Sequence, residues 1–161
     1  IRTRLVGSEM CIRDSDRIAN SVAGYLITEA DTVVIDLGTA TTFDVVSKNK
    51  EYLGGSIAPG IKISLDALTL KTASLKSVEL DTPNKVIGKN TYEAIQSGLI
   101  MGHASMIDSM VEKIILEIDI EPKIILTGGL SKVVQPILNV NVEYIENLTL
   151  VGLEEIFKLN N

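Results

Sequence analysis

The spacing of apolar residues changes several times along the chain, and each change marks the start of a different predicted element. From Asp16 onward, apolar residues recur every three to four positions for about three turns, which predicts an amphipathic helix. Ser15 or Asp16 is placed to cap its start. Three short runs of apolar and β-branched residues then predict strands at 33–35, 42–46 and 52–57. Because tight turns join the three runs, we expect an antiparallel meander.

The second half of the chain alternates between helical and strand-like spacing. Ala58-Pro59-Gly60 ends the third strand, and Pro59 is placed where a helix can begin. Residues 74–89 have the composition of a loop. The remaining segments are predicted as helices at 61–73, 90–118, 130–138 and 148–159, and as strands at 123–127 and 142–145. This order favours an α/β fold in which a mixed five-stranded sheet carries helices on both faces.

Asp36 interrupts a run that is otherwise apolar and predicted to be buried. An unpaired buried carboxylate is costly, so we expect a cation, a hydrogen-bond donor or water beside it. The next residues, Gly38, Thr39, Thr41 and Thr42, form a short loop rich in small and hydroxyl side chains. Backbone N–H groups of such a turn can hold phosphate oxygens without a lysine. A tight hairpin with an acidic residue at its edge is the alternative interpretation.

Composition narrows the classes of protein that fit. The 161 residues suffice for one domain with a full core, and the formal net charge of -6 with no basic stripe argues against a nucleic-acid surface. No apolar run reaches the roughly 20 residues that span a membrane. The single cysteine indicates the reducing cytoplasm rather than a disulfide framework. His103 is the only histidine, and we expect it to serve in packing or at an interface rather than in catalysis.

Residues 1–15 do not share the pattern of the rest of the chain. They have no clear apolar period and no signal-peptide core. The stretch Ser8–Ser15 resembles the peptide that results when sequencing-adaptor DNA is read as coding sequence. We therefore expect 1–15 to be a non-native leader, which leaves Cys11 without a role, and 16–161 to be the C-terminal domain of a longer protein. A genuine but disordered N-terminal tail is the alternative.

From residue 33 onward, the order of elements resembles the ribonuclease-H-like half-domain of the actin, sugar-kinase and acetate-kinase superfamily. Proteins of that superfamily build an ATP site from two such halves. The motifs narrow the resemblance further, to type III pantothenate kinases. Five stretches of this chain resemble motifs of that family, and they follow in the family's order: Asp16–Asn20, Asp36–Val45, Tyr52–Ile61, Ile87–Thr91 with Ser97-Gly98, and Leu126–Leu130.

This resemblance implies a reaction and a set of site residues. Family members transfer the γ-phosphoryl group of ATP to the terminal hydroxyl of pantothenate, the first step of coenzyme A synthesis. By resemblance, Asp16 is the catalytic base and binds the substrate with Arg17, whose guanidinium can hold an anion in a bidentate fork. Asp36 is implied to bind a monovalent cation (potassium or ammonium), Thr39 to contact ATP, and Thr91 to contact pantothenate. Mg²⁺ is expected to arrive with ATP, held largely by phosphate and water.

Several of these positions also have a purely structural interpretation. Asp16 and Thr91 can serve as helix caps. Gly54, Gly55 and Gly60 are expected to shape the wall of the substrate pocket. The alternative is that they serve only the geometry of turns. Gly128-Gly129 resemble the nucleotide-side turn of the superfamily, although a strand-to-helix turn alone carries little information.

Two departures from the family pattern bear on activity. Asp14-Ser15 stand where the family has Gly and a small residue before Asp-Arg. The family's first phosphate motif, Asp-x-Gly-Asn-Thr, is absent from this chain. We therefore expect the chain alone to have little or no kinase activity.

Family members are homodimers that share the pantothenate pocket between subunits. The predicted helix at 90–118 is the candidate contact, because Gly98 and Gly102 lie four residues apart on one face; packing within the chain is the alternative. Three other functions remain open at this level. They are a non-catalytic regulatory or accessory homologue, another small-molecule kinase of the same superfamily, and an actin-like assembly protein.

Overall fold

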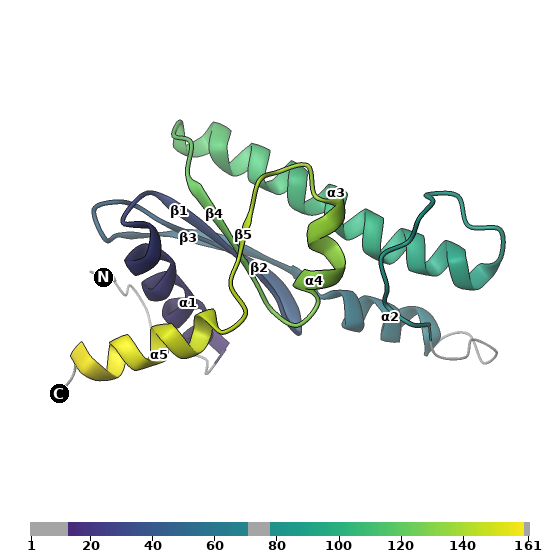
Figure 1. The fold of residues 1–161 in the computed structure, drawn as a ribbon, viewed down its shortest axis with the longest axis horizontal. Coiled ribbons are helices and arrows are strands. Elements are labelled where there is room, and N and C mark those ends of the chain that lie inside the picture. The colour runs from purple at the N-terminus through teal and green to yellow at the C-terminus, as the bar shows by residue number, and fades with distance from the viewer. Residues whose placement is uncertain (1–12, 71–77, 160–161) are drawn as a thin grey trace.

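A computed structural model describes residues 13–70 and 78–159, in which a single five-stranded sheet is flanked by helices (Figure 1). The strands are β1 (Thr32–Leu37), β2 (Ala40–Val46), β3 (Tyr52–Pro59), β4 (Lys123–Thr127) and β5 (Glu143–Tyr144). The helices are α1 (Arg13–Thr28), α2 (Ile61–Thr69), α3 (Thr91–Ile118), α4 (Ser131–Val134), the 3₁₀ turn η1 (Gln135–Ile137) and α5 (Leu148–Leu159).

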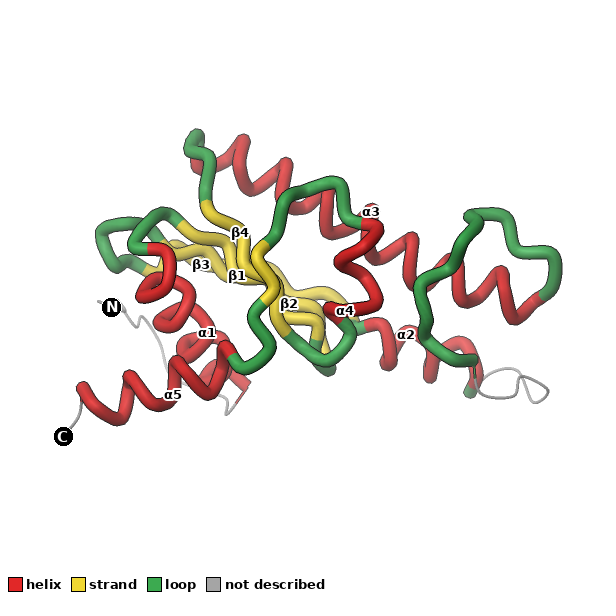
Figure 2. Tube along the Cα trace, in the orientation of Figure 1, coloured by secondary structure: helices red, strands yellow, loops and turns green. Residues whose placement is uncertain are grey.

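The sheet has the strand order β3-β2-β1-β4-β5. Strand β2 pairs antiparallel with both β1 and β3, whereas β4 pairs parallel with β1 and β5. The meander is therefore confirmed, as is the mixed five-stranded sheet. In Figure 2, α1 and α5 lie side by side on one face of the sheet, and α3 runs along the other.

The alternation of side chains along β1 divides the core into two layers. Val33, Ile35 and Leu37 pack toward α3 in the larger cluster of buried apolar residues. Val34 points the other way, into a smaller cluster with Ala23 of α1 and residues of β4 and α5. Asp36 follows Val34 at the strand period of two, so its carboxylate lies on the side of α1. The larger core stabilises the sheet, and the thinner layer beneath α1 is where polar groups gather.

Helix α1 begins at Arg13, three residues before Asp16. The prediction that Ser15 or Asp16 caps this helix is therefore wrong, because both residues lie within its first turn. A carboxylate in the first turn interacts favourably with the helix dipole, so Asp16 suits this position as well as it would suit the cap. Of the predicted leader, residues 1–12 lie outside the described part of the chain, and the boundary at residue 16 remains a prediction.

The helix predicted at 130–138 is shorter than expected. Helix α4 covers Ser131–Val134 and passes directly into the 3₁₀ turn η1, with Pro136 near the start of that turn. Proline lacks the N–H that a continued α-helix would need, and its ring clashes with the preceding turn. Strand β5 is also shorter than the predicted 142–145, and α2 ends at Thr69, with Ala73 outside the described residues.

Helix α3 is the longest element, and its predicted span is confirmed. Asn90 caps its N-terminus by accepting a hydrogen bond from the Glu93 backbone N–H, and the Glu93 side chain reaches back to Asn90 and Lys89. Thr91 is thus the first helical residue, so the structural alternative for it, a cap, is wrong. His103 contacts the backbone oxygens of Leu99 and Pro59 at 3.0 and 3.1 Å, which joins α3 to the end of β3 and confirms a packing role.

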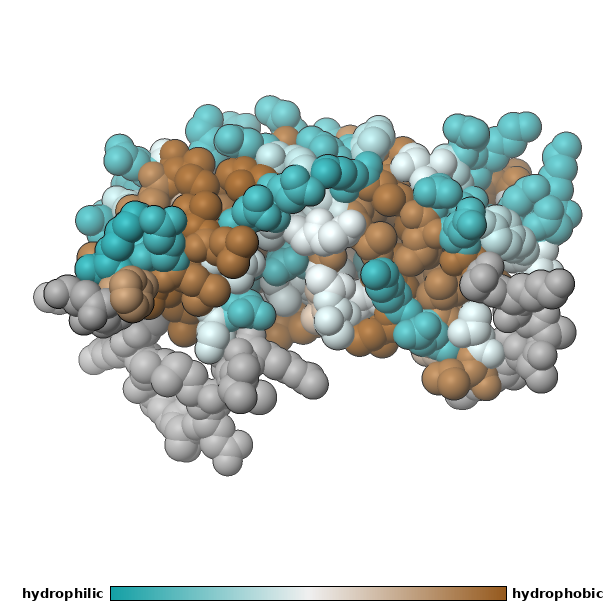
Figure 3. All heavy atoms as spheres, turned by 60° about the horizontal axis from the view of Figure 1, so that its bottom comes forward, coloured by the Kyte–Doolittle hydropathy of each residue, from teal (hydrophilic) through white to brown (hydrophobic). Residues whose placement is uncertain are grey.

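Large apolar side chains remain exposed on several elements of the molecule, α5 among them. Figure 3 shows apolar surface on the side where α1 and α5 lie, and the exposed residues there include Leu150, Leu153 and Phe157 of α5. Within residues 13–70 and 78–159, no helix has both the length and the apolar character that a membrane crossing requires.

Candidate functional site

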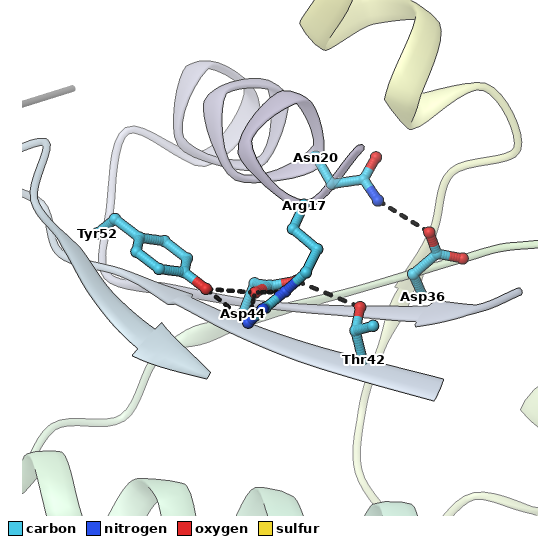
Figure 4. Close-up of polar contacts among 6 residues, drawn as sticks. All are labelled: Arg17, Asn20, Asp36, Thr42, Asp44 and Tyr52. Carbon is cyan, nitrogen blue, oxygen red and sulfur yellow. Dashed lines mark hydrogen bonds and ion pairs between the residues drawn. The ribbon is translucent and has the colours of Figure 1, made fainter. Parts of the chain in front are cut away.

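Polar and charged side chains gather where α1 crosses the sheet (Figure 4). Asp36 of β1 pairs across the sheet with Thr42 of β2, and Asp44 lies two residues further along β2. Because side chains two apart on a strand share a face, all three project toward α1. Arg17 and Asn20 come down from α1, one helical turn apart, to meet them. The site therefore depends on the packing of one helix over two central strands.

Asp36 is bound from the helix side. The Asn20 side-chain amide donates to its Oδ2 at 2.9 Å, and the amide oxygen of Asn20 accepts from the Thr149 hydroxyl of α5 at 2.7 Å. Burial raises the pKa of the Asp36 carboxyl, the hydrogen bond from Asn20 opposes that shift, and the negative charges of Asp16 and Asp44 add to it. Asp36 is thus half-buried rather than fully buried as expected, and Asn20 supplies the expected hydrogen-bond donor.

The second oxygen of Asp36 faces backbone that carries no side chains. A Cβ built on Gly128 would lie 2.6 Å from Asp36 Oδ1, and one on Gly38 would lie 3.5 Å from it. Gly128 also has φ of +100°, a conformation that L side chains rarely adopt. Among the described residues, none donates a hydrogen bond to this oxygen. The two glycines therefore let backbone lie close to an oxygen of a half-buried carboxylate that receives no hydrogen bond from the described residues.

Arg17 lies between α1 and the meander. Its Nε and Nη2 approach Oδ1 of Asp44 at 2.9 and 2.7 Å, and Nη2 also donates to the Tyr52 hydroxyl at 2.7 Å. Tyr52 in turn donates to Asp44 Oδ1 at 2.7 Å, and the Thr42 hydroxyl donates to Oδ2 at 3.2 Å. The Asp44 side chain is 1% exposed and that of Arg17 is 18% exposed. A nearly inaccessible carboxylate is thus neutralised by a cation that reaches solvent.

The structure brings together part of the predicted site. Asp16 and Arg17 are neighbours on α1, and the charge of Asp16 acts on Asp36. Thr39 is exposed in the turn between β1 and β2, which the Gly38 N–H closes on the Ala40 oxygen at 3.1 Å. Gly60 packs against the backbone of this turn so closely that no side chain would fit.

Thr91 is not part of this cluster. It is exposed at the N-terminus of α3, at the opposite end of the molecule from α1 (Figure 1).

Four polar residues of the site were not foreseen from the sequence: Asn20, Thr42 as a partner of Asp44, Asp44 itself and Tyr52. A signal for Asp44 was present, because it shares the strand face of Thr42 and interrupts the otherwise apolar run from Phe43 to Val46. The signal for Asn20 was its place one turn after Arg17. Tyr52 carried no such signal, since the strand bulge between Val45 and Val46 sets its register.

The strand order and pairing define the fold. A meander followed by two parallel strands, with helices on both faces of the sheet, is the half-domain fold that is also found in actin-like ATPases. The solved Alp12 filament structure has this fold, with a TM-score of 0.60 and 15% identity; the match covers 88% of this chain and 51% of that one.

The chain belongs to the type III pantothenate kinase family. The family model for "Type III pantothenate kinase" matches residues 14–113. The type III pantothenate kinase of Anaeromyxobacter sp. (strain K) is 44% identical over 146 residues, which are 91% of this chain and 58% of that relative. A structure from Campylobacter jejuni described as a Baf family transcriptional activator is 28% identical, with a TM-score of 0.63, and covers 97% of this chain and 69% of that one. The chain thus spans little more than half the length of its curated relatives.

Proposed function

We propose that this chain is the C-terminal half of an enzyme that transfers the γ-phosphoryl group of ATP to the terminal hydroxyl of pantothenate. The observation that carries the proposal is the grouping of Asp16, Arg17 and Asp36 where α1 crosses β1, the positions that resemble the family's site. Phosphoryl transfer needs positioning, neutralisation of charge and a base for the attacking hydroxyl. The grouping offers a residue for each of these needs.

In this proposal Asp16 accepts the proton of the attacking hydroxyl. Its side chain is exposed in the first turn of α1, so a substrate can approach it. Arg17, next to it, holds an anionic group of the acceptor substrate. Thr39 contacts ATP from the turn between β1 and β2, where small residues let phosphate oxygens come close to the backbone.

A monovalent cation, potassium or ammonium, is proposed to bind at Asp36. The support is Asp36 Oδ1, which lies beside Gly38 and Gly128 and receives no hydrogen bond from the described residues, together with the raised pKa of this carboxyl, since a bound cation offsets the cost of removing a negative charge from water. When bound, it supplies positive charge near the phosphates of ATP. Mg²⁺ is proposed to enter with ATP, held largely by phosphate and water rather than by this chain. Among the described residues, no group of three or more His, Cys, Asp or Glu side chains could hold a metal ion.

A homodimer is proposed for the complete protein, with Thr91 reaching the pantothenate pocket of the partner subunit. Two observations support it. Thr91 lies far from Asp16 within one chain (Figure 1), and added Cβ atoms at Gly98 and Gly102 of α3 would meet nothing within 4 Å. The face of α3 at Gly98 and Gly102 is therefore not covered by packing within the described residues. A cytoplasmic location remains a prediction.

A regulatory or accessory homologue is the second candidate, because the Campylobacter jejuni structure carries a transcriptional activator's description. The test is to supply ATP, Mg²⁺, potassium and pantothenate to the complete protein and to detect 4'-phosphopantothenate by mass spectrometry. The proposal expects ATP-dependent product. Absence of product from a folded complete protein would favour the regulatory homologue.

The 161-residue chain alone is expected to give little or no product under the same conditions. It spans 58% of the length of its relative, and an ATP site of this superfamily needs both halves. Turnover by this chain at the rate of the complete protein would contradict that expectation.

A further inference from the structure

The side of Arg17 that faces the sheet is held by more contacts than charge neutralisation needs. One carboxylate would balance the guanidinium, yet Asp44 and the Tyr52 hydroxyl both bind it, and each also binds the other. We infer that Asp44 and Tyr52 are positioning residues that hold the Arg17 guanidinium in one orientation toward the acceptor substrate. The inference rests on the proposed function for the identity of that substrate only.

The contacts fix the plane of the guanidinium group. Nε and Nη2 are neighbouring nitrogens on one edge of this rigid plane, and both approach Asp44 Oδ1, at 2.9 and 2.7 Å. The bond from Nη2 to the Tyr52 oxygen at 2.7 Å adds a second anchor on a different strand. Two anchors on one edge prevent rotation about the last bonds of the side chain, and arginine is the residue in which such a fork fixes direction as well as charge.

The anchors are themselves rigid. Asp44 lies in β2, which is paired on both sides, by β1 and by β3. Both carboxylate oxygens of Asp44 are bound, one by Tyr52 and the other by Thr42, so the group cannot turn to follow a moving arginine. The Asp44 side chain is 1% exposed, which keeps water from replacing these bonds.

The sheet leaves room for this arrangement at Gly55. A Cβ at Gly55 would lie 3.0 Å from both Arg17 Nη2 and Asp44 Oδ1, and it would collide with the Phe43 carbonyl oxygen. The bulge between Val45 and Val46 shifts the register of β3, so that Tyr52 pairs with Val46 and its hydroxyl reaches Asp44. Two features of β3 thus make room for the Arg17 guanidinium: the missing side chain at Gly55 and the irregular register at Tyr52.

An ordinary ion pair that only joins α1 to the sheet is the competing explanation. It would contribute to stability but would not affect how the substrate binds. The two explanations differ in what happens when the hydrogen bonds are removed one at a time while the fold is retained. Tyr52→Phe removes only a hydroxyl, and Asp44→Asn keeps the shape of the side chain.

The first measurement uses the ¹⁵N-labelled 161-residue chain. The heteronuclear NOE of the Arg17 Nε–Hε group, assigned with an Arg17→Lys sample, reports the order of the side chain on the ps–ns timescale. We expect a rigid group in the wild type and a clearly lower NOE in Tyr52→Phe and Asp44→Asn. Glu146→Gln, the same acid-to-amide change at the exposed Lys132–Glu146 pair, is the control and is expected to leave Arg17 unchanged.

The second measurement uses the complete enzyme. In Tyr52→Phe we expect the KM for pantothenate to rise about tenfold with kcat within about threefold, because the lost interaction concerns substrate binding. Should Asp44→Asn fail to fold, Tyr52→Phe carries the test. An unchanged Arg17 NOE in folded Tyr52→Phe overturns the inference, and so does a lowered NOE with an unchanged KM, since that outcome describes an ion pair with a structural role only. If the wild type does not phosphorylate pantothenate, the proposed function fails, and the NOE alone decides whether Asp44 and Tyr52 hold Arg17.

Discussion

At the scale of single residues, Asp36 shows how a site can cost stability. Its carboxyl is largely buried, receives one hydrogen bond from the neutral Asn20 amide, and lies near the charges of Asp16 and Asp44. Burial and the two neighbouring negative charges disfavour the ionised form of Asp36, whereas the Asn20 hydrogen bond favours it. The sequence predicted that Asp36 would need a partner, and the structure supplies an incomplete one. Residues whose local environment is unfavourable in the free protein are typical of binding sites.

Replacing Asp36 by Asn tests this account through pH. Because burial raises the pKa of Asp36, the folded state holds the proton more tightly than the unfolded chain, so stability falls as the pH rises through the raised pKa. Below the ordinary pKa of 3.8 both states are protonated and the penalty is absent. In buffer free of potassium and ammonium, Asp36→Asn is expected to raise the melting temperature at pH 7 and to leave it nearly unchanged at pH 3.

The control for this comparison is Asp66→Asn on the exposed face of α2, which should show no such pH dependence. Addition of potassium at pH 7 is expected to stabilise the wild type and not the Asp36→Asn variant. A lower melting temperature of Asp36→Asn at pH 7 without potassium would show that the ionised carboxylate stabilises the free protein, contrary to this account.

At the scale of elements, local patterns were enough for most of the fold. Apolar spacing located the helices and strands, because their period reports which face is buried, and the capping residue Asn90 lies where the long helix was expected to begin. The helix at 130–138 was overestimated because Pro136 was not weighed as a break. The start of α1 was misplaced because the residues before Asp16 were assigned to a leader. The pairing of Arg17 with Asp44 depends on how α1 packs over the sheet, which no local pattern contains.

The crossing of α1 and α5 yields a prediction at the same scale. A Cβ at Gly152 of α5 would collide with the backbone of Ala19 in α1, whereas one at Gly102 of α3 would meet nothing within 4 Å. Gly152→Ala is therefore expected to destabilise the chain by about 1–3 kcal/mol, as overpacking of a close contact does. Gly102→Ala, the matched control, should stabilise it by up to about 1 kcal/mol through helix propensity.

Urea unfolding followed by circular dichroism measures both variants. Equal effects of the two substitutions would mean that α1 and α5 do not pack at Gly152 as described. Such a result would also question the Thr149–Asn20–Asp36 chain, because α5 carries Thr149 to the site.

At the scale of the whole molecule, the described residues bring together only part of the predicted site. Asp16, Arg17 and Asp36 come together within it, whereas Thr91 does not, and the chain spans 58% of the length of its relative. The resemblance of the motifs predicted all of these residues, but it could not say which of them meet within one chain. That distinction required the position of α3 relative to α1 (Figure 1).

The proposed dimer is tested by Gly98→Leu in the complete protein. Among the described residues, a Cβ at Gly98 would meet nothing within 4 Å outside its own stretch of helix, so the fold should be retained. A subunit contact at this face of α3 should be blocked by the leucine side chain. Sedimentation at micromolar concentration is expected to show a dimer for the wild type and a monomer for the variant. Glu121→Leu, exposed beyond the other end of α3, is the control. A wild type that sediments as a monomer would remove the dimer from the account.

In the proposed function, phosphoryl transfer takes place where α1 crosses the sheet, with Asp16 as the base. The most direct test is the rate of ADP release by the complete enzyme with ATP, potassium and pantothenate, compared between the wild type and Asp16→Asn. Because Asp16 is exposed, the substitution should leave the fold intact, and general-base catalysis typically contributes a factor of about 100 or more. The kcat of Asp16→Asn is expected to be at least about 100-fold lower than that of the wild type, with an unchanged melting temperature. A folded Asp16→Asn variant that turns over pantothenate at the wild-type rate would contradict it.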